Sequence, residues 1–212
     1  MYKAVIFDMD GVIINSQPLH YKTDIAVLKK AGYPAVMETV VKYTGISNPD
    51  RWPKYQETLN LSYSAETLIE WQTQLIMEIF DEAPLDAIEG IPELLSHISE
   101  KGLRIALASS SQHALIELVL KKFGISHYFE VIVSGEDVSK GKPAPDVFLR
   151  TAEKLGIAPE HCIVIEDSPH GIQAAKNAKM RCIAYRNPST YGQDFSIADY
   201  VADRYEECYQ WL

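Results

Sequence analysis

Residues 4–12, Ala-Val-Ile-Phe-Asp-Met-Asp-Gly-Val, join a short apolar run directly to two carboxylates. A run of this kind, without a polar break, is typical of a strand buried on both faces of a parallel sheet. Side chains two residues apart in an extended chain point the same way, so Asp8 and Asp10 would face one small volume. Two such acids suit a nucleophile and a general acid, or a shared divalent cation. The alternative is a hairpin at an Asp-Gly turn.

The same kind of apolar run recurs along the chain. The predicted strands cover residues 4–7, 103–108, 131–133, 162–165 and 182–185. Helical periodicity lies between them, for example over 113–123 and 146–155, each followed by a glycine that favours a helix end. This alternation predicts an α/β fold, in which a Rossmann-like parallel sheet carries helices on both faces.

One long stretch interrupts the alternation. Between residues 16 and 86 no buried-strand run occurs, whereas residues 21–30 and 65–80 have the length and polarity of amphipathic helices. Prolines, among them Pro53, punctuate this stretch and favour boundaries or turns. We therefore predict two domains, an α/β core of residues 1–15 and 87–212 and an inserted helical domain of residues 16–86.

The composition excludes several classes of partner. The 212 residues are 47% hydrophobic and 23% charged, as in folded globular proteins. The 29 acidic and 20 basic side chains give a net charge of −9, and no cluster of Lys and Arg is present to neutralise a run of phosphates. We therefore expect no nucleic-acid partner. We also expect no membrane partner, because no apolar run approaches the roughly 18 to 20 residues of a bilayer span.

The cellular compartment is predicted from cysteine usage and from the start of the chain. The three cysteines, Cys162, Cys182 and Cys208, have no metal-binding spacing and suit reduced thiols. The first residues lack the apolar stretch and cleavage site of a signal peptide. We expect a cytoplasmic protein.

Two loops supply candidate groups for binding an anion. Residues 106–111, Ala-Leu-Ala-Ser-Ser-Ser, place hydroxyls, Ser109 first, where a strand meets a helix, although a plain helix N-cap is the alternative. In residues 139–146, Ser-Lys-Gly-Lys-Pro-Ala-Pro-Asp, prolines restrict the directions open to Lys142. A fixed ammonium would neutralise phosphoryl oxygens, but Lys140 is a rival, and a solvated loop lysine is the alternative.

A fourth group, Glu166 and Asp167, ends the run of residues 162–165. Carboxylate oxygens suit Mg²⁺, although acids near a helix start also complement the helix dipole. Ligands of an open parallel sheet bind beyond the carboxyl ends of its strands, and three of the four groups directly follow strands. The sequence therefore predicts that the four groups form a single site.

In order and spacing these motifs resemble the haloacid dehalogenase-like (HAD) hydrolase superfamily, specifically its beta-phosphoglucomutase-like phosphatase subgroup. Residues 8–12, Asp-Met-Asp-Gly-Val, look like the first motif. Ser109, Lys142 within Gly-Lys-Pro-Ala-Pro-Asp, and Glu166-Asp167-Ser168 look like the second, third and fourth. The family's helical cap domain, inserted after the first motif, matches residues 16–86.

This resemblance implies a role for each motif residue. Asp8 would be the nucleophile that forms an aspartyl-phosphate, and Asp10 the acid for the leaving oxygen and then the base for water. Ser109 and Lys142 would bind the phosphoryl oxygens. The implied cofactor is Mg²⁺, held by Asp8, the backbone carbonyl of Asp10, Asp167 and Glu166. The predicted partner is a small phosphorylated substrate, and we expect a monomer.

The predicted cap domain favours one activity of the subgroup over the other. The mutases carry a cap arginine after a Gly-Val-Ser-like turn, whereas residues 45–47 here, Gly-Ile-Ser, precede Asn48, with Arg51 nearby. A cap lysine of the mutases would fall near Trp71, in a segment without lysine. A bisphosphate needs cations at both ends, so we favour a phosphatase acting on sugar phosphates over a beta-phosphoglucomutase-type mutase. His20 would lie near Asp10 in a closed cap, or is a plain surface histidine.

Two other classes of protein are less consistent with this pattern. A phospho-acceptor receiver also places carboxylates, a hydroxyl, a lysine and Mg²⁺ on a parallel sheet, but its lysine comes last, whereas Glu166 and Asp167 follow Lys142 here. A catalytically silent binding protein has little support, because every catalytic position is filled. The sequence therefore favours an enzyme.

Overall fold

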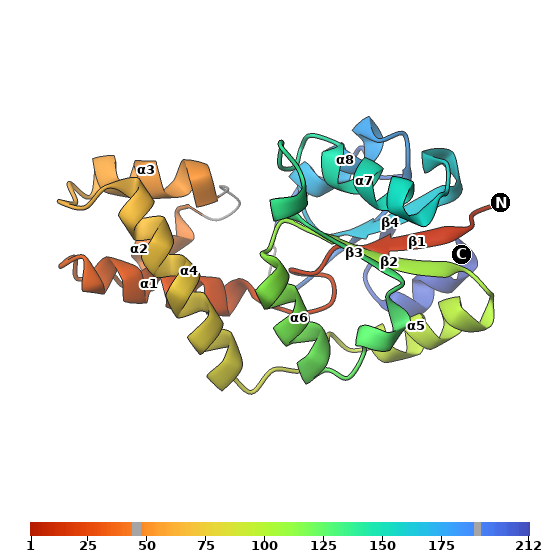
Figure 1. Ribbon diagram of the computed structural model, residues 1–212, viewed down its shortest axis with the longest axis horizontal. Coiled ribbons are helices and arrows are strands. Elements are labelled where there is room, and N and C mark those ends of the chain that lie inside the picture. The colour runs from red at the N-terminus through yellow and green to blue at the C-terminus, as the bar shows by residue number, and fades with distance from the viewer. Residues whose placement is uncertain (44–47, 189–191) are drawn as a thin grey trace. The chain divides into compact units, whose positions relative to one another are not determined.

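The computed structural model describes residues 1–43, 48–188 and 192–212. The chain divides into two compact units (Figure 1). The α/β unit comprises residues 1–15 and 85–212, and the helical unit comprises residues 16–84. The second boundary thus lies two residues before the position expected from the sequence.

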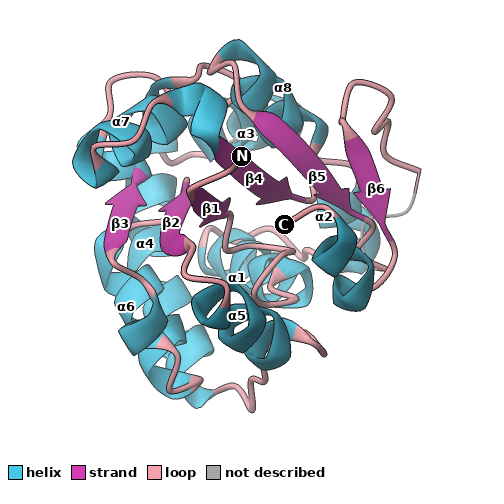
Figure 2. Ribbon diagram, turned by 90° about the vertical axis from the view of Figure 1, so that its right-hand side faces the viewer, coloured by secondary structure: helices cyan, strands magenta, loops and turns pink. Residues whose placement is uncertain are grey.

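The α/β unit contains one parallel sheet. Within the described residues its strands are β1 (Ala4–Phe7), β2 (Arg104–Ser109), β3 (Val131–Ser134), β4 (Cys162–Glu166), β5 (Arg181–Tyr185) and β6 (Tyr200–Ala202). Their order is β3-β2-β1-β4-β5-β6, and every neighbouring pair is parallel (Figure 2). The predicted Rossmann-like α/β fold is confirmed, and the strand order reverses at β1. β6 carries no apolar run that would predict a strand, because only Ala202 of its three residues is buried.

Helices cover both faces of this sheet (Figure 2). They are α5 (Ile91–Glu100) and α6 (His113–Lys122) on one face, and α7 (Asp146–Leu155) and α8 (Pro169–Asn177) on the other. Ala4 and Ile6 pack in one apolar cluster with residues of α7 and α8. Phe7 points to the opposite face, where its ring meets Phe129 edge-on at 6.2 Å. Burial on both faces explains the unbroken apolar runs of the strands.

The helical unit consists of α1 (Gln17–Lys30), α2 (Met37–Val41), α3 (Asn48–Thr58) and α4 (Ala65–Glu82). The two helices predicted at 21–30 and 65–80 lie inside α1 and α4 and are confirmed. Pro53 does not mark a boundary as expected, because it lies inside α3 between Trp52 and Tyr55, which are fully buried. Packing of these two aromatic side chains outweighs the local preference of proline.

No helix in the described part of the chain combines the length and the apolar character of a membrane span.

Candidate active site

The carboxyl ends of the parallel strands form one edge of the sheet, which is called the sheet edge below. The strand order places Asp8 at the centre of this edge. Asp8 follows β1, whose last residue, Phe7, pairs with Leu107 of β2 and Ile165 of β4. The Asp8 backbone N–H donates to the Ile165 carbonyl at 3.0 Å, and only 6% of the residue is exposed. Because β1 pairs in parallel on both sides, the hairpin alternative is wrong. Asp8 instead lies where the strand order reverses, which is where open sheets bind ligands.

The turn after Asp8 is shaped around a second carboxylate. Backbone N–H groups of Val12 and Ile13 donate to the Met9 carbonyl, which closes the turn. Gly11 has a φ of +83°, and a Cβ at this position would lie 1.9 Å from Oδ2 of Asp167. Only glycine therefore permits both this backbone conformation and the approach of Asp167.

Two buried side chains from the end of the chain hold this turn. The Asn187 amide donates to the Gly11 carbonyl at 2.9 Å, and the Tyr205 hydroxyl donates to the Val12 carbonyl. Asn187 is 2% exposed and Tyr205 is 1% exposed. Neither residue was predicted from the sequence, because neither belongs to a motif and each is far from the turn in sequence.

Lys142 lies among the predicted acids with its side chain 7% exposed. Its ammonium donates to Oδ1 of Asp8 at 2.5 Å, to Oε1 of Glu166 at 2.9 Å and to the Ala108 carbonyl at 3.3 Å. An ammonium has three protons, and each has an acceptor here. The rival Lys140 is exposed. The structure thus brings Lys142, rather than Lys140, to the sheet edge.

Glu166 holds Lys142 with one oxygen and the next loop with the other. Its Oε2 accepts from the backbone N–H of Ser168 at 2.7 Å and from the Ser168 hydroxyl at 3.0 Å. The Ser168 hydroxyl in turn accepts from the N–H of Gly171 at 3.0 Å, in the first turn of α8. A Cβ on Gly171 would lie 1.6 Å from Oε1 of Glu166. This glycine therefore provides the space that the glutamate occupies.

The serines after β2 make a second set of contacts. Ser109 is fully buried, and its hydroxyl accepts from the N–H of Ser111 at 3.0 Å. The Ser111 hydroxyl donates to Oδ2 of Asp10 at 2.7 Å. The N-cap alternative is wrong, since α6 begins at His113 after Gln112. Ser109 lies at the predicted edge, but the contact between Ser111 and Asp10 was not foreseen.

The chain belongs to a known family by its sequence. The family described as haloacid dehalogenase-like hydrolase matches residues 5–185. The chain is a member of this family. The resemblance drawn from the four motifs is therefore confirmed, and the receiver alternative is excluded.

Similar proteins include enzymes named as phosphatases. The chain is 32% identical over 180 residues to a phosphorylated carbohydrates phosphatase of Thermotoga maritima, covering 83% of this chain and 81% of that protein. It is 32% identical over 189 residues to a fructose-1-phosphate phosphatase of Escherichia coli, covering 87% and 97%. The structure of a beta-phosphoglucomutase from Clostridium difficile matches with a TM-score of 0.81 at 28% identity, covering 98% of this chain and 93% of that one. The prediction of a HAD-type phosphomonoesterase agrees with the names of the two phosphatases.

The predicted cap residues of this HAD hydrolase form contacts within the helical unit. Residues 45–47 lie outside the described residues. Arg51 pairs with Asp24, Nε to Oδ2, at 3.1 Å, and their side chains are 11% and 4% exposed. Asn48 donates to the buried Gln72 at 3.2 Å. The ring of His20 meets Phe80 at 5.6 Å, and its predicted contact with Asp10 stays a prediction.

The acids at the sheet edge carry more negative charge than Lys142 balances. Burial, followed by the charges of Glu166 and Asp10, raises the pKa of Asp8 to about 8, although Lys142 opposes this rise. Burial and the charges of Glu166 and Asp8 likewise raise the pKa of Asp167 well above its ordinary value. Burial alone would lower the pKa of Lys142, but the two carboxylates that it contacts raise it.

This donor set fits a divalent cation chemically. It offers hard carboxylate and carbonyl oxygens, and burial followed by the neighbouring carboxylates raises the pKa of Asp8 and of Asp167, so an added positive charge would be favourable there. Across the described residues no three His, Cys, Asp or Glu side chains converge as a ready-made metal cluster. The ammonium of Lys142 contacts both Asp8 and Glu166.

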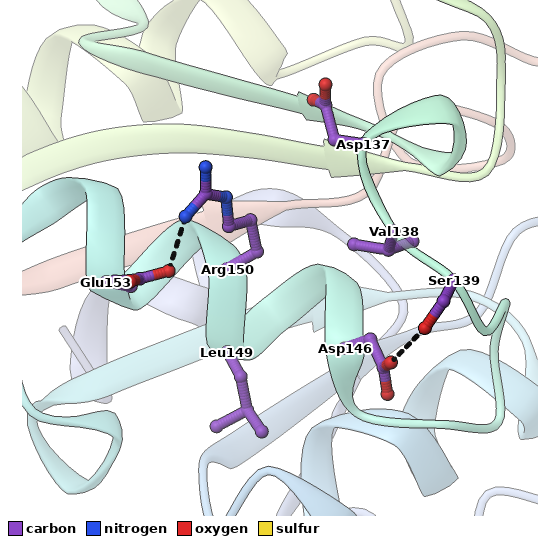
Figure 3. Close-up of a pocket in the computed structure, with 7 residues that line it drawn as sticks. All are labelled: Asp137, Val138, Ser139, Asp146, Leu149, Arg150 and Glu153. Atoms are coloured by element: carbon purple, nitrogen blue, oxygen red, sulfur yellow. Dashed lines mark hydrogen bonds and ion pairs between the residues drawn. The ribbon is translucent and has the colours of Figure 1, made fainter.

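A separate surface cavity of about 600 Å³ lies beside α7 (Figure 3). It is lined by Asp137, Val138, Ser139, Asp146, Leu149, Arg150 and Glu153. Three carboxylates face it with one guanidinium, and that guanidinium is bound to Glu153 at 2.6 Å. None of the residues that the sequence predicts for the site lines this cavity.

The space at Gly171 gives a test of this geometry. Gly to Ala within a helix ordinarily stabilises a protein by roughly 0.5–1 kcal/mol. Gly171→Ala should instead lower the free energy of unfolding by about 1–3 kcal/mol, because Glu166 cannot move without losing its bonds to Lys142 and Ser168. Urea unfolding measures the difference.

The matched control is Gly141→Ala, since no atom lies within 4 Å of a Cβ at that position. Its free energy of unfolding should stay within about 0.5 kcal/mol of the wild type. A Gly171→Ala protein as stable as the wild type would contradict the tight contact.

Proposed function

We propose that this chain is a Mg²⁺-dependent phosphatase that hydrolyses small phosphorylated metabolites, with sugar phosphates as the substrate class, through an aspartyl-phosphate intermediate. The observation that carries the proposal is the ammonium of Lys142 between Asp8 and Glu166 at the reversal point of the sheet. The contact supports the proposal, because a carboxylate nucleophile needs a cation beside it to receive an anionic phosphoryl group. The names of the relatives, which refer to phosphorylated carbohydrates and fructose 1-phosphate, support the substrate class.

The reaction has two steps, both carried by residues of the chain. In the first, an Asp8 oxygen forms a bond to phosphorus, the bond from phosphorus to the ester oxygen breaks, and Asp10 gives that oxygen its proton. In the second, Asp10 takes a proton from water as the water oxygen attacks phosphorus, which releases inorganic phosphate and restores Asp8. Lys142 and Ser109 bind the phosphoryl oxygens, since phosphoryl transfer depends mainly on positioning and charge neutralisation.

Asp8, the backbone carbonyl of Asp10, and Asp167 would hold Mg²⁺. Glu166 is the fourth ligand in the proposal, and its Oε1 has a second lone pair besides the one that accepts from Lys142. The ion would relieve the repulsion between a carboxylate nucleophile and an anionic substrate. A cytoplasmic location and a monomeric state stay predictions, and the three buried, unpaired cysteines agree with a reducing compartment.

A phosphatase is favoured over a mutase by the state of Arg51. A mutase must bind a second phosphate, and Arg51 is the basic residue nearest to the position where mutases carry their arginine. Here Asp24 neutralises Arg51 in a pair that is nearly buried, and Tyr55 donates to the same carboxylate at 3.2 Å. Freeing Arg51 for a phosphate would leave a buried carboxylate without its partner, which is costly.

Asp8→Asn tests the nucleophile. The wild type with Mg²⁺ should release phosphate from at least one member of a panel of sugar and nucleotide monophosphates. The variant should be slower by on the order of 10³-fold or more, because an amide does not attack phosphorus. Asp203→Asn, which removes a carboxylate that is 61% exposed, is the matched control and should retain activity. A wild type without activity, or an equally active Asp8→Asn, contradicts the mechanism.

Removal of the metal tests the cofactor with two readouts. A chelator should abolish phosphate release, and added Mg²⁺ should restore it. At about 100 times its Kd, Mg²⁺ should also raise the unfolding temperature by about 5–10 °C, because binding then contributes about 2.7 kcal/mol. Asp167→Asn should lose most of this rise, and Asp203→Asn should keep it. An unfolding temperature independent of Mg²⁺ would be evidence against the site.

The fate of beta-glucose 1-phosphate separates phosphatase from mutase. Because Arg51 is paired with Asp24, the expected products are free glucose and phosphate. Coupled detection with glucose 6-phosphate dehydrogenase should give no signal above the background rate. Rapid formation of glucose 6-phosphate would show that the protein is a mutase and that the phosphatase hypothesis is wrong.

A further inference from the structure

We propose that Ser111 is a positioning residue, which fixes the Asp10 carboxylate for delivery of a proton to the leaving oxygen. The inference rests on the proposed function, because it takes Asp10 as the general acid. Its starting observation is the 2.7 Å hydrogen bond from the Ser111 hydroxyl to Oδ2 of Asp10. The two residues lie 101 positions apart in sequence and meet only because β1 and β2 are neighbours.

Asp10 differs from the other acids of the site in its surroundings. Asp8, Glu166 and Asp167 are each at most 6% exposed, whereas Asp10 is only partly buried. A partly exposed side chain on a turn retains more rotamer freedom than one enclosed by packing. A hydrogen bond from a fixed hydroxyl selects among these rotamers and so directs the carboxylate.

The position of Ser111 is set because both of its backbone polar groups are held, which limits the places that its hydroxyl can reach. Its N–H donates to the buried Ser109 hydroxyl at 3.0 Å. Its carbonyl accepts from the Ser134 hydroxyl at 2.7 Å, and Ser134, at the end of β3, is fully buried. Three serines from the ends of two neighbouring strands thus form one connected support for Asp10.

The turn after β3 packs against the same loop with little space to spare. A Cβ on Gly135 would lie 2.8 Å from the Ser110 carbonyl oxygen. Glu136 accepts from the N–H of His113 at 2.9 Å, and the Ser134 hydroxyl accepts from the N–H of Glu136 at 3.1 Å. The position of Ser111 is therefore determined by β3 as well as by β2.

The chemistry of the leaving group gives this contact a distinct signature. A sugar alkoxide is a poor leaving group and needs its proton as the bond to phosphorus breaks. A 4-nitrophenolate is stable as an anion and needs far less help. General acid catalysis typically contributes 10²–10⁴-fold, so misdirection of the acid should cost part of that factor with a sugar phosphate only.

The experiment compares Ser111→Ala with the wild type on two substrates. These are 4-nitrophenyl phosphate and the sugar phosphate with the highest kcat/KM in the panel. We expect kcat/KM to fall about tenfold or more with the sugar phosphate and less than about threefold with 4-nitrophenyl phosphate. Both values come from one preparation, so partial misfolding would lower them equally. An equal loss on both substrates, or no loss, overturns the inference.

Two further variants separate this inference from the proposed function. Asp10→Asn should show the same dependence on the leaving group to a larger extent, and if it does not, the acid role of Asp10 is wrong. If Asp10→Asn shows the dependence and Ser111→Ala does not, only the role of Ser111 fails. Ser96→Ala removes a similar serine-to-carboxylate bond, from Ser96 to Glu100 at 3.2 Å on the surface of α5, and should match the wild type on both substrates.

Discussion

The arrangement of the candidate active site depends on one ammonium group shared by two buried carboxylates. Lys142 contacts Asp8, at the end of β1, and Glu166, at the end of β4, so it joins the two strands that flank the reversal point. Buried charges are stable only when they are paired and hydrogen-bonded, and all three protons of this ammonium have acceptors. Removing the lysine would leave carboxylates that already show raised pKa values with still less compensation.

A second constraint is space. Two glycines stand where any side chain would collide with a carboxylate, Gly11 against Asp167 and Gly171 against Glu166. The positions of the acids therefore depend on the lack of a side chain at these glycines as well as on hydrogen bonds. Asn187 and Tyr205 hold the Gly11 turn through its carbonyl groups, so the end of the chain contributes to the site without supplying a reactive group.

The parts of the fold that sequence predicted well are those in which local pattern and burial agree. The central strands are buried on both faces, carry continuous apolar runs and were predicted. The outermost strand β6 has a single buried residue and was not predicted. Lys142, Asp8 and Glu166 were predicted together because each follows a strand or lies in the loop after one. Asn187, Tyr205 and the bond from Ser111 to Asp10 depend on tertiary contacts between distant segments, and no local pattern marks them.

The two units use basic residues in different ways, and this bears on what each is able to bind. In the α/β unit, Lys142 faces more carboxylates than it neutralises, so added positive charge is favourable there and an anion is bound best together with a cation. In the helical unit, Arg51 and Asp24 neutralise each other in a nearly closed pair, and Asn48 and Gln72 complete a neutral polar network beside them. The net charge of −9 does not by itself exclude a small anion, because four of the acids, Asp8, Asp10, Glu166 and Asp167, lie at one end of the sheet, where an added cation would offset their charge.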